Sequence, residues 1–117
     1  MIDFYGYSRC DTCRKAQKLL DSLGIAYRFI DITEQPPTRA QLKAALTSGK
    51  YKLSELCNRS GVQYRELNMK EQLKTLPESE VLSLLAQNGR LCKRPFITDG
   101  KSIIVGFDAD ALRSTWG

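Results

Sequence analysis

IDFYGYSRCDTCRKA, residues 2–16, changes character halfway along its length. Residues 2–7 are rich in aromatic and apolar side chains, which favour a short β-strand. Two cysteines then follow at a spacing of three, Cys10 and Cys13, and beyond them apolar residues recur at the spacing of a helix, ending at Gly24 as a C-cap. The stretch therefore predicts a strand that runs into a helix, with the cysteine pair at the junction.

A second strand is predicted after this helix. Residues 26–32 contain Tyr27, Phe29, Ile30 and Ile32, and Pro36 and Pro37 then interrupt the pattern. Strand, helix and strand make a βαβ unit, whose crossover is almost always right-handed and whose strands are parallel.

The middle of the chain is predicted to be helical. Thr38 and Gln41 have the spacing of a capping box, and Pro77 suits the first turn of a helix that ends near Gly89. Shorter turns are predicted at residues 53–57 and 67–73, and Tyr64 and Leu67 are candidate core residues. The insertion formed by these helices covers about residues 38–90.

The C-terminal part predicts a hairpin and a closing helix. Asp99 and Gly100 form a dipeptide that favours a type I′ turn between strands at 96–98 and 102–105. Asp108 is then a candidate N-cap. The whole order predicts an α/β protein with one domain over residues 1–117, in which a four-stranded mixed sheet is flanked by helices in the plan of thioredoxin-like domains.

Composition limits the possible functions. The 18 Lys and Arg residues against 13 Asp and Glu give a net charge of +5, but the basic residues are spread along the chain, so we expect no direct nucleic-acid binding. Histidine is absent, which excludes an imidazole base and a mixed Cys/His zinc site. Met1 leads directly into the first strand without the features of a secretory signal, and no apolar run could span a membrane, so a cytoplasmic protein with reduced cysteines is expected.

A thiol at the N-terminus of a helix has a lowered pKa, because unpaired backbone N–H groups and the helix dipole favour an anion. Cys10 occupies that position. Arg9 adds positive potential nearby, while Asp11 opposes it. Two residues between the cysteines allow Cys13 to attack a mixed disulfide formed on Cys10, as thiol–disulfide exchange requires. The alternative is that the pair is a zinc half-site or two idle thiols.

Cys57 and Cys92 lack a second CxxC spacing, so a four-cysteine zinc site is not predicted and no metal is expected. Free cysteine is among the most buried residue types. We therefore expect both to be small apolar core residues.

Four stretches resemble segments of the arsenate reductase (ArsC)/Spx family, in the same order and spacing, and together they extend over nearly the whole chain. They are YSRCDTCRKA at residues 7–16, DITEQPP at 31–37, NRSGVQYREL at 58–67 and KRP at 93–95. The resemblance implies a thioredoxin fold with a helical insertion, in which Cys10 attacks an oxyanion or a disulfide. Arg94 would stabilise the thiolate and bind the anion, and Pro95 matches a proline commonly held in cis opposite the active cysteine.

The same resemblance also sets the alternatives. Arsenate reductases of this family hold the oxyanion with two further arginines, one in the middle region and one after the hairpin. In this chain Asn58 or Arg59 stands at the first position, and the segment after the hairpin supplies no arginine. This difference argues against arsenate as the substrate. Cys13 gives the pair found in Spx-type redox regulators, which are implied to bind RNA polymerase through the C-terminal domain of its α-subunit. We favour a thiol oxidoreductase that acts as a monomer, holds no bound cofactor, and reduces arsenate or a protein or glutathione disulfide. Glutathione with glutaredoxin, or thioredoxin, would supply the electrons.

Overall fold

The computed structural model describes all 117 residues, 1–117. The chain divides into two compact units, which we describe separately. The sheet unit comprises Met1–Ile32 and Arg94–Gly117, and the helical unit comprises Thr33–Lys93.

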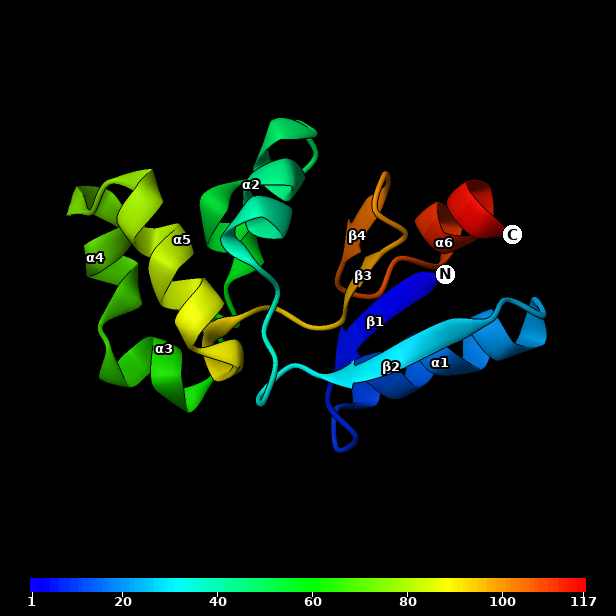
Figure 1. Cartoon of the computed structure of the whole chain (residues 1–117). Helices are drawn as coiled ribbons and strands as arrows, with labels where there is room; N and C mark the ends of the chain where they lie inside the picture. Colours follow the sequence, from blue (N-terminus) through cyan, green and yellow to red (C-terminus); the bar gives the residue numbers. More distant parts are fainter. The chain divides into compact units, whose positions relative to one another are not determined.

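The sheet unit contains four strands in the order β2-β1-β3-β4. β1 is parallel to β2, whereas β3 is antiparallel to both β1 and β4, which confirms the predicted four-stranded mixed sheet (Figure 1). The strands are β1 (Ile2–Gly6), β2 (Tyr27–Asp31), β3 (Phe96–Thr98) and β4 (Ile103–Val105), and the helices of this unit are α1 (Asp11–Ser22) and α6 (Ala109–Trp116).

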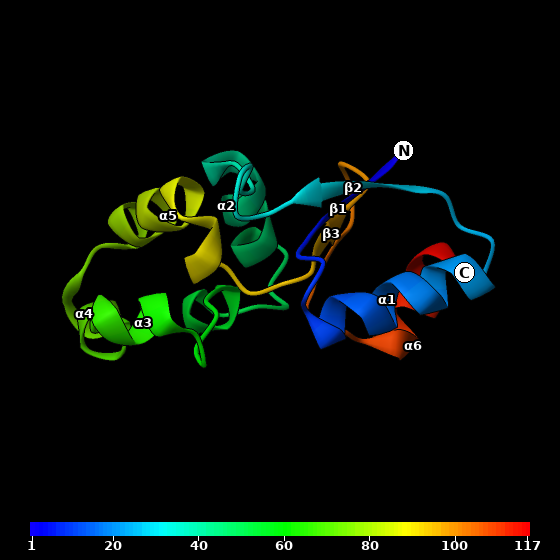
Figure 2. The same cartoon turned by 90° about the horizontal axis from the view of Figure 1, so that it is seen from below.

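The core of the sheet unit lies between one face of the sheet and these two helices, which lie on the same side of it (Figure 2). Phe4 stands opposite Phe29 in β2 and Ile97 in β3, so β1 provides the centre of that face. The buried cluster consists of Ile2, Phe4, Cys13, Ala16, Leu20, Ile97, Ile104 and Leu112. The three α1 members recur at positions 13, 16 and 20, which is the helical spacing that the sequence predicts.

Local signals set the ends of both helices. Cys10 is the N-cap of α1, and Gly24, at φ 71°, turns the chain away after the C-cap Leu23. The Asp108 side chain accepts a hydrogen bond from the Ala111 N–H at 3.1 Å, which confirms it as the N-cap of α6.

The hairpin lies where it is predicted, but its turn differs. Thr98 pairs with Ile103, so residues 99–102 connect the strands instead of a two-residue turn. A type I′ turn needs positive φ at both central residues, and Gly100 has it at 95° whereas Asp99 does not. The Asp99 carboxylate instead accepts two backbone N–H groups of the loop, at 2.8 and 2.7 Å. The type I′ prediction is therefore wrong: the backbone N–H groups of Lys101 and Ser102 donate to the Asp99 side chain, and the connection is longer than two residues.

The helical unit contains short helices joined by tight connections. They are α2 (Arg39–Thr47), η1 (Leu53–Leu56), α3 (Val62–Glu66), α4 (Met69–Thr75), α5 (Glu78–Gln87) and η2 (Gly89–Leu91). The capping box at α2 is confirmed: Thr38 Oγ1 accepts from the Gln41 N–H at 3.2 Å, and Gln41 Oε1 accepts from the Thr38 N–H at 2.9 Å. Lys43 and Glu78 form an ion pair between α2 and α5 at 2.5 Å.

The predicted turn at residues 67–73 is displaced. α3 ends at Glu66 and α4 begins at Met69, because Asn68 between them adopts φ 51° and breaks the helical path. Tyr64 and Leu67 are only half-buried, while the neighbouring Met69 is fully buried. Met69 therefore takes the core position that the sequence assigns to them.

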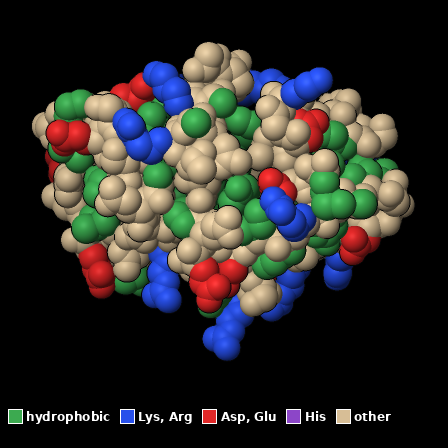
Figure 3. Space-filling model, in the orientation of Figure 1, with side chains coloured by type: hydrophobic (Ala, Val, Ile, Leu, Met, Phe, Trp, Pro, Cys, Tyr) green, Lys and Arg blue, Asp and Glu red, His purple; other side chains and the backbone are tan.

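No helix has both the length and the apolar character needed to cross a membrane. On the face drawn in Figure 3, Lys and Arg side chains are scattered among Asp and Glu side chains instead of forming one patch.

Candidate functional site

Cys10 sits in the connection between β1 and α1. Its backbone N–H donates to the Tyr7 carbonyl at 3.1 Å, which forms a tight turn, and its own carbonyl accepts from the Arg14 N–H at 3.0 Å, which starts the helix. The backbone at Cys10 is extended, as N-cap residues usually are. The strand end and the helix start together fix where the thiol points.

The Cys10 sulfur accepts a hydrogen bond from the Cys13 backbone N–H, with 3.3 Å between the two atoms. A sulfur thus takes the place that a Ser or Asp oxygen usually has at an N-cap, where a negative charge meets the positive end of the helix. Both cysteines are reduced; Cys10 is partly exposed and Cys13 is buried. The structure confirms the predicted placement of the pair at the first turn of the helix.

The two thiols have opposite acid–base tendencies. Burial by itself would raise the pKa of Cys10, but hydrogen bonds from Cys13 and the charge and hydrogen bond of Arg94 outweigh it, so that the pKa is lowered. Burial, reinforced by the hydrogen bond and charge of Cys10, raises the pKa of Cys13 to about 12. The arrangement therefore favours the thiolate at Cys10 over a thiolate at Cys13.

Arg94 follows the helical unit in sequence and precedes β3. Its guanidinium carbon lies 5.2 Å from the centroid of the Tyr7 ring, within the range of a cation–π contact. The Arg94–Pro95 peptide bond is cis, and the Pro95 carbonyl accepts the Gly106 N–H at 2.8 Å. Arg94, Pro95 and the cysteine pair thus all belong to the sheet unit.

Tyr7 is a site residue that the sequence reasoning did not single out. Its carbonyl accepts the Cys10 N–H, its backbone lowers the pKa of the Cys13 thiol, and its ring lies beneath Arg94. The available signal was its position at the end of the first strand, immediately before the cysteine motif.

The other basic residues near the motif are placed differently. Arg14 donates to the Ser8 carbonyl at 3.1 Å and pairs with Asp11 at 3.4 Å, on the exposed side of α1. Arg9 is exposed, and it is Arg94 whose charge acts on the Cys10 thiol. A role for Arg9 in binding an anion stays a prediction.

Asn58 and Arg59 belong to the helical unit. The Asn58 N–H donates to the Leu91 carbonyl at 2.7 Å, and its carbonyl accepts the Gly61 N–H at 3.0 Å, so this residue organises a turn. Arg59 is exposed, and its charge acts on Cys57. Their roles toward a substrate at Cys10 remain predictions.

Cys57 and Cys92 are each 1% exposed, which confirms them as buried residues. Nowhere do three or more His, Cys, Asp or Glu side chains gather in a way that could hold a metal ion. The four-cysteine zinc alternative therefore has no ligand cluster in this structure.

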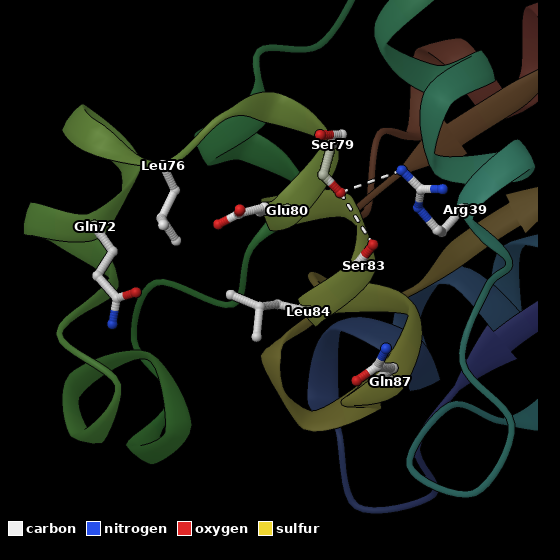
Figure 4. A pocket seen from close by; sticks show the side chains of 8 residues that line it. All are labelled: Arg39, Gln72, Leu76, Ser79, Glu80, Ser83, Leu84 and Gln87. Carbon is white, nitrogen blue, oxygen red and sulfur yellow. Dashed lines mark hydrogen bonds between the residues drawn. The ribbon is translucent and has the colours of Figure 1, made fainter.

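The helical unit also carries an open hollow of about 430 Å³ (Figure 4). Arg39 reaches across from α2 and donates to the Ser79 carbonyl at 3.2 Å, and Ser83 donates to the same carbonyl at 3.1 Å. The lining residues are Arg39, Gln72, Leu76, Ser79, Glu80, Ser83, Leu84 and Gln87. None of them is a thiol, so the hollow offers nothing to the chemistry of the cysteine motif.

Comparison with known proteins gives a consistent result. The chain is 45% identical to the uncharacterised protein YusI of Bacillus subtilis over 115 residues, which cover 98% of each chain. It is 31% identical to the global transcriptional regulator Spx of Enterococcus faecalis, covering 97% of this chain and 84% of that protein. The crystal structure of a possible arsenate reductase from Streptococcus mutans UA159 superposes with a TM-score of 0.85 at 37% identity, covering 92% of this chain and 91% of the other. The ArsC family model matches residues 5–115, so this chain belongs to the ArsC family.

Proposed function

We propose that this protein is a thiol oxidoreductase in which Cys10 is the nucleophile and Cys13 is the resolving thiol. The observation that carries the proposal is the position of the Cys10 sulfur at the N-cap of α1, where it accepts the Cys13 N–H at 3.3 Å beside Arg94. Family membership and the helix-terminal position both favour thiolate chemistry.

The reaction proceeds in two exchanges. The Cys10 thiolate attacks one sulfur of a substrate disulfide; a bond forms between the two sulfurs, the substrate bond breaks, and its other half leaves as a thiolate. Cys13 then gives up its proton to solvent and attacks the Cys10 sulfur, which releases the second half of the substrate and leaves a Cys10–Cys13 disulfide. Two thiols are oxidised and one substrate disulfide is reduced.

The resolving step becomes easier once the Cys10 thiolate has been converted into a mixed disulfide. Burial holds the pKa of Cys13 high, and the negative charge on Cys10 raises it further. Once Cys10 is in a mixed disulfide, that charge is gone and Cys13 deprotonates more readily. Arg94 remains nearby to stabilise the developing negative charge, and glutathione with glutaredoxin, or thioredoxin, would regenerate the dithiol. Arsenate remains a candidate substrate: the Cys10 thiolate would bond to arsenic as a protonated arsenate oxygen leaves as water, and a second thiol, from Cys13 or glutathione, would attack the Cys10 sulfur and release arsenite. Arg94 and Arg9 are the candidate anion-binding groups of the sheet unit.

The test uses the wild type with Cys10→Ser and Cys13→Ser. Turnover of a glutathione mixed disulfide, coupled to glutathione reductase, is expected to vanish in Cys10→Ser. In Cys13→Ser a glutathione adduct should accumulate on Cys10, visible by intact-mass spectrometry. Equal turnover in all three proteins would refute the assignment. Arsenate in place of the disulfide, with the same variants, tests the second substrate.

A second candidate function is a redox-sensing regulator. The CxxC pair, whose spacing would allow a disulfide to form under oxidising conditions, and the similarity to Spx favour it. In that case the protein would bind the C-terminal domain of the RNA polymerase α-subunit in one redox state. Pull-down with that domain under oxidising and reducing conditions distinguishes the two; binding without disulfide turnover would support the regulator.

A further inference from the structure

Cys57 and Cys92 lie side by side within the helical unit, although 35 positions separate them in the chain. They are partners in an isolated antiparallel β-bridge. Two backbone hydrogen bonds hold this bridge: the Asn58 N–H donates to the Leu91 carbonyl at 2.7 Å, and the Lys93 N–H donates to the Leu56 carbonyl at 2.8 Å. The bridge thus fixes the register between two segments that α3, α4 and α5 separate.

The register decides what the two sulfurs can do. Both hydrogen bonds run between the residues that flank the cysteines, and none joins the cysteines themselves. This is the non-hydrogen-bonded antiparallel pair, in which the Cα atoms are about 4.5 Å apart and the side chains of the pair are closest. A disulfide needs a Cα separation of roughly 4.4–6.8 Å, and the separation typical of this register falls within that range.

Both thiols are reduced and bonded to carbonyl groups in this structure. Cys92 Sγ donates to the Leu85 carbonyl at 3.2 Å, and Cys57 Sγ lies 3.8 Å from the Leu53 carbonyl. Each residue is 1% exposed, and burial raises the pKa of Cys57 to about 11 and that of Cys92 to about 12. Thiolate is therefore scarce at neutral pH, and the pair reacts slowly compared with Cys10.

We propose that Cys57 and Cys92 are a second redox pair, which closes into a disulfide under sustained oxidation and covalently links the two bridged segments of the helical unit. The proposal follows from the register of the bridge and does not depend on the chemistry assigned to Cys10 and Cys13. Because the disulfide would close the loop that carries α3, α4 and α5, it would stabilise this unit against unfolding.

The oxidant is a small disulfide such as oxidised glutathione. During a local opening, the thiolate of one cysteine attacks it and releases one glutathione thiolate, which takes up a proton. The second cysteine loses its proton to solvent and attacks the mixed disulfide, which releases the other glutathione. Two protein thiols are oxidised, and one oxidised glutathione becomes two reduced molecules.

The experiment is done in the variant Cys10→Ser/Cys13→Ser, which removes the other pair. Native protein is incubated with oxidised glutathione at neutral and alkaline pH, free thiols are alkylated under denaturing conditions, and tryptic peptides are analysed without reduction. Trypsin cuts after Lys52, Arg59, Arg90 and Lys93, so Cys57 and Cys92 fall on separate peptides, 53–59 and 91–93. A linked peptide that dithiothreitol separates is expected, and it should form faster at alkaline pH.

Two comparisons make the result decisive. Wild-type protein under the same conditions shows, through peptide 10–14, that the oxidant is active. The additional substitution Cys57→Ala should remove the linked peptide and also the rise in thermal midpoint that oxidation gives the parent variant. Alkylated Cys57 and Cys92, or only glutathione adducts on each, at both pH values would overturn the proposal.

Discussion

Arg94 acts on the Cys10 thiol through charge and a hydrogen bond, and it lies against the Tyr7 ring. These contacts give the cysteine motif a cation that is remote in sequence, while the nearer Arg14 is held by Ser8 and Asp11. At the residue scale, then, proximity in the sequence does not show which charged side chain lowers the pKa of Cys10.

The first residue-scale prediction concerns Arg94→Ala. Removing a cation that lowers the pKa of Cys10 should raise that pKa, so the fraction of Cys10 present as thiolate at a given pH should fall. The measurement is the rate of iodoacetamide alkylation against pH. Arg113→Ala, which removes an equally charged but exposed residue of α6, is the matched control and should leave the profile in place. An unchanged profile in Arg94→Ala would contradict the electrostatic role.

The second residue-scale prediction concerns Tyr7. The cation–π contact with Arg94 is of the order of 0.5–1 kcal/mol at an exposed site, so Tyr7→Leu should shift the Cys10 titration upward by less than Arg94→Ala does. Tyr7→Phe retains the ring and should behave as the wild type. Equal shifts of the Cys10 pKa in Tyr7→Leu and Tyr7→Phe would instead mean that the Tyr7 hydroxyl, and not the ring, is responsible.

At the scale of elements, short-range hydrogen bonds set where helices begin. The α2 capping box and the Asp108 cap satisfy backbone N–H groups that have no partner within the helix. The two helices of the sheet unit share its core with β1, and α2 and α5 are joined by the Lys43–Glu78 ion pair within the helical unit.

The element-scale prediction is that Thr38→Ala destabilises the protein by about 1 kcal/mol, because it removes the acceptor for the Gln41 N–H. Urea unfolding followed by circular dichroism measures it. Thr38→Ser keeps a hydroxyl and should stay close to the wild type. A loss of the same size in both variants would mean that the threonine methyl group, and not the cap, is responsible.

At the scale of the whole molecule, buried thiols link stability to pH. The pKa values of Cys57 and Cys92, about 11 and about 12 in the folded protein, lie above the ordinary value of 9.0. The unfolded chain therefore releases these protons first as the pH rises. Their contribution to the free energy of unfolding is fully present below about pH 9 and is lost as the pH rises through the folded values. The contribution of Cys10 to the free energy of unfolding changes with pH in the opposite direction, since its pKa is lowered on folding.

We therefore expect the reduced wild type to lose stability more steeply above about pH 9 than Cys57→Ala/Cys92→Ala does. Urea unfolding at a series of pH values, with a reductant present, gives the two slopes. The variant should be less stable at neutral pH, because small cavities replace two buried sulfurs. Parallel slopes would show that other groups, such as lysines and tyrosines, account for the alkaline loss.

The sequence alone determined the features that depend on residues a few positions apart. The Thr38–Gln41 capping box, the Asp108 cap, Gly24 after α1 and the thiol at the start of α1 were all predicted, because each rests on hydrogen bonds or backbone angles within one turn. The βαβ order also fixed the parallel pairing of β1 and β2, since the handedness of the crossover leaves one topology.

Tertiary structure decided what depends on segments distant in sequence. From its own residues Arg94 would be taken for a surface cation, and only the family resemblance pointed to the site; its contact with Tyr7 appears when β1 and β3 pair. Cys57 and Cys92 were expected to be small buried core residues, and only the isolated bridge shows that they lie side by side. The physical reason is that local hydrogen bonds are encoded by neighbouring residues, whereas the neighbours of a buried side chain are chosen by how the whole chain packs.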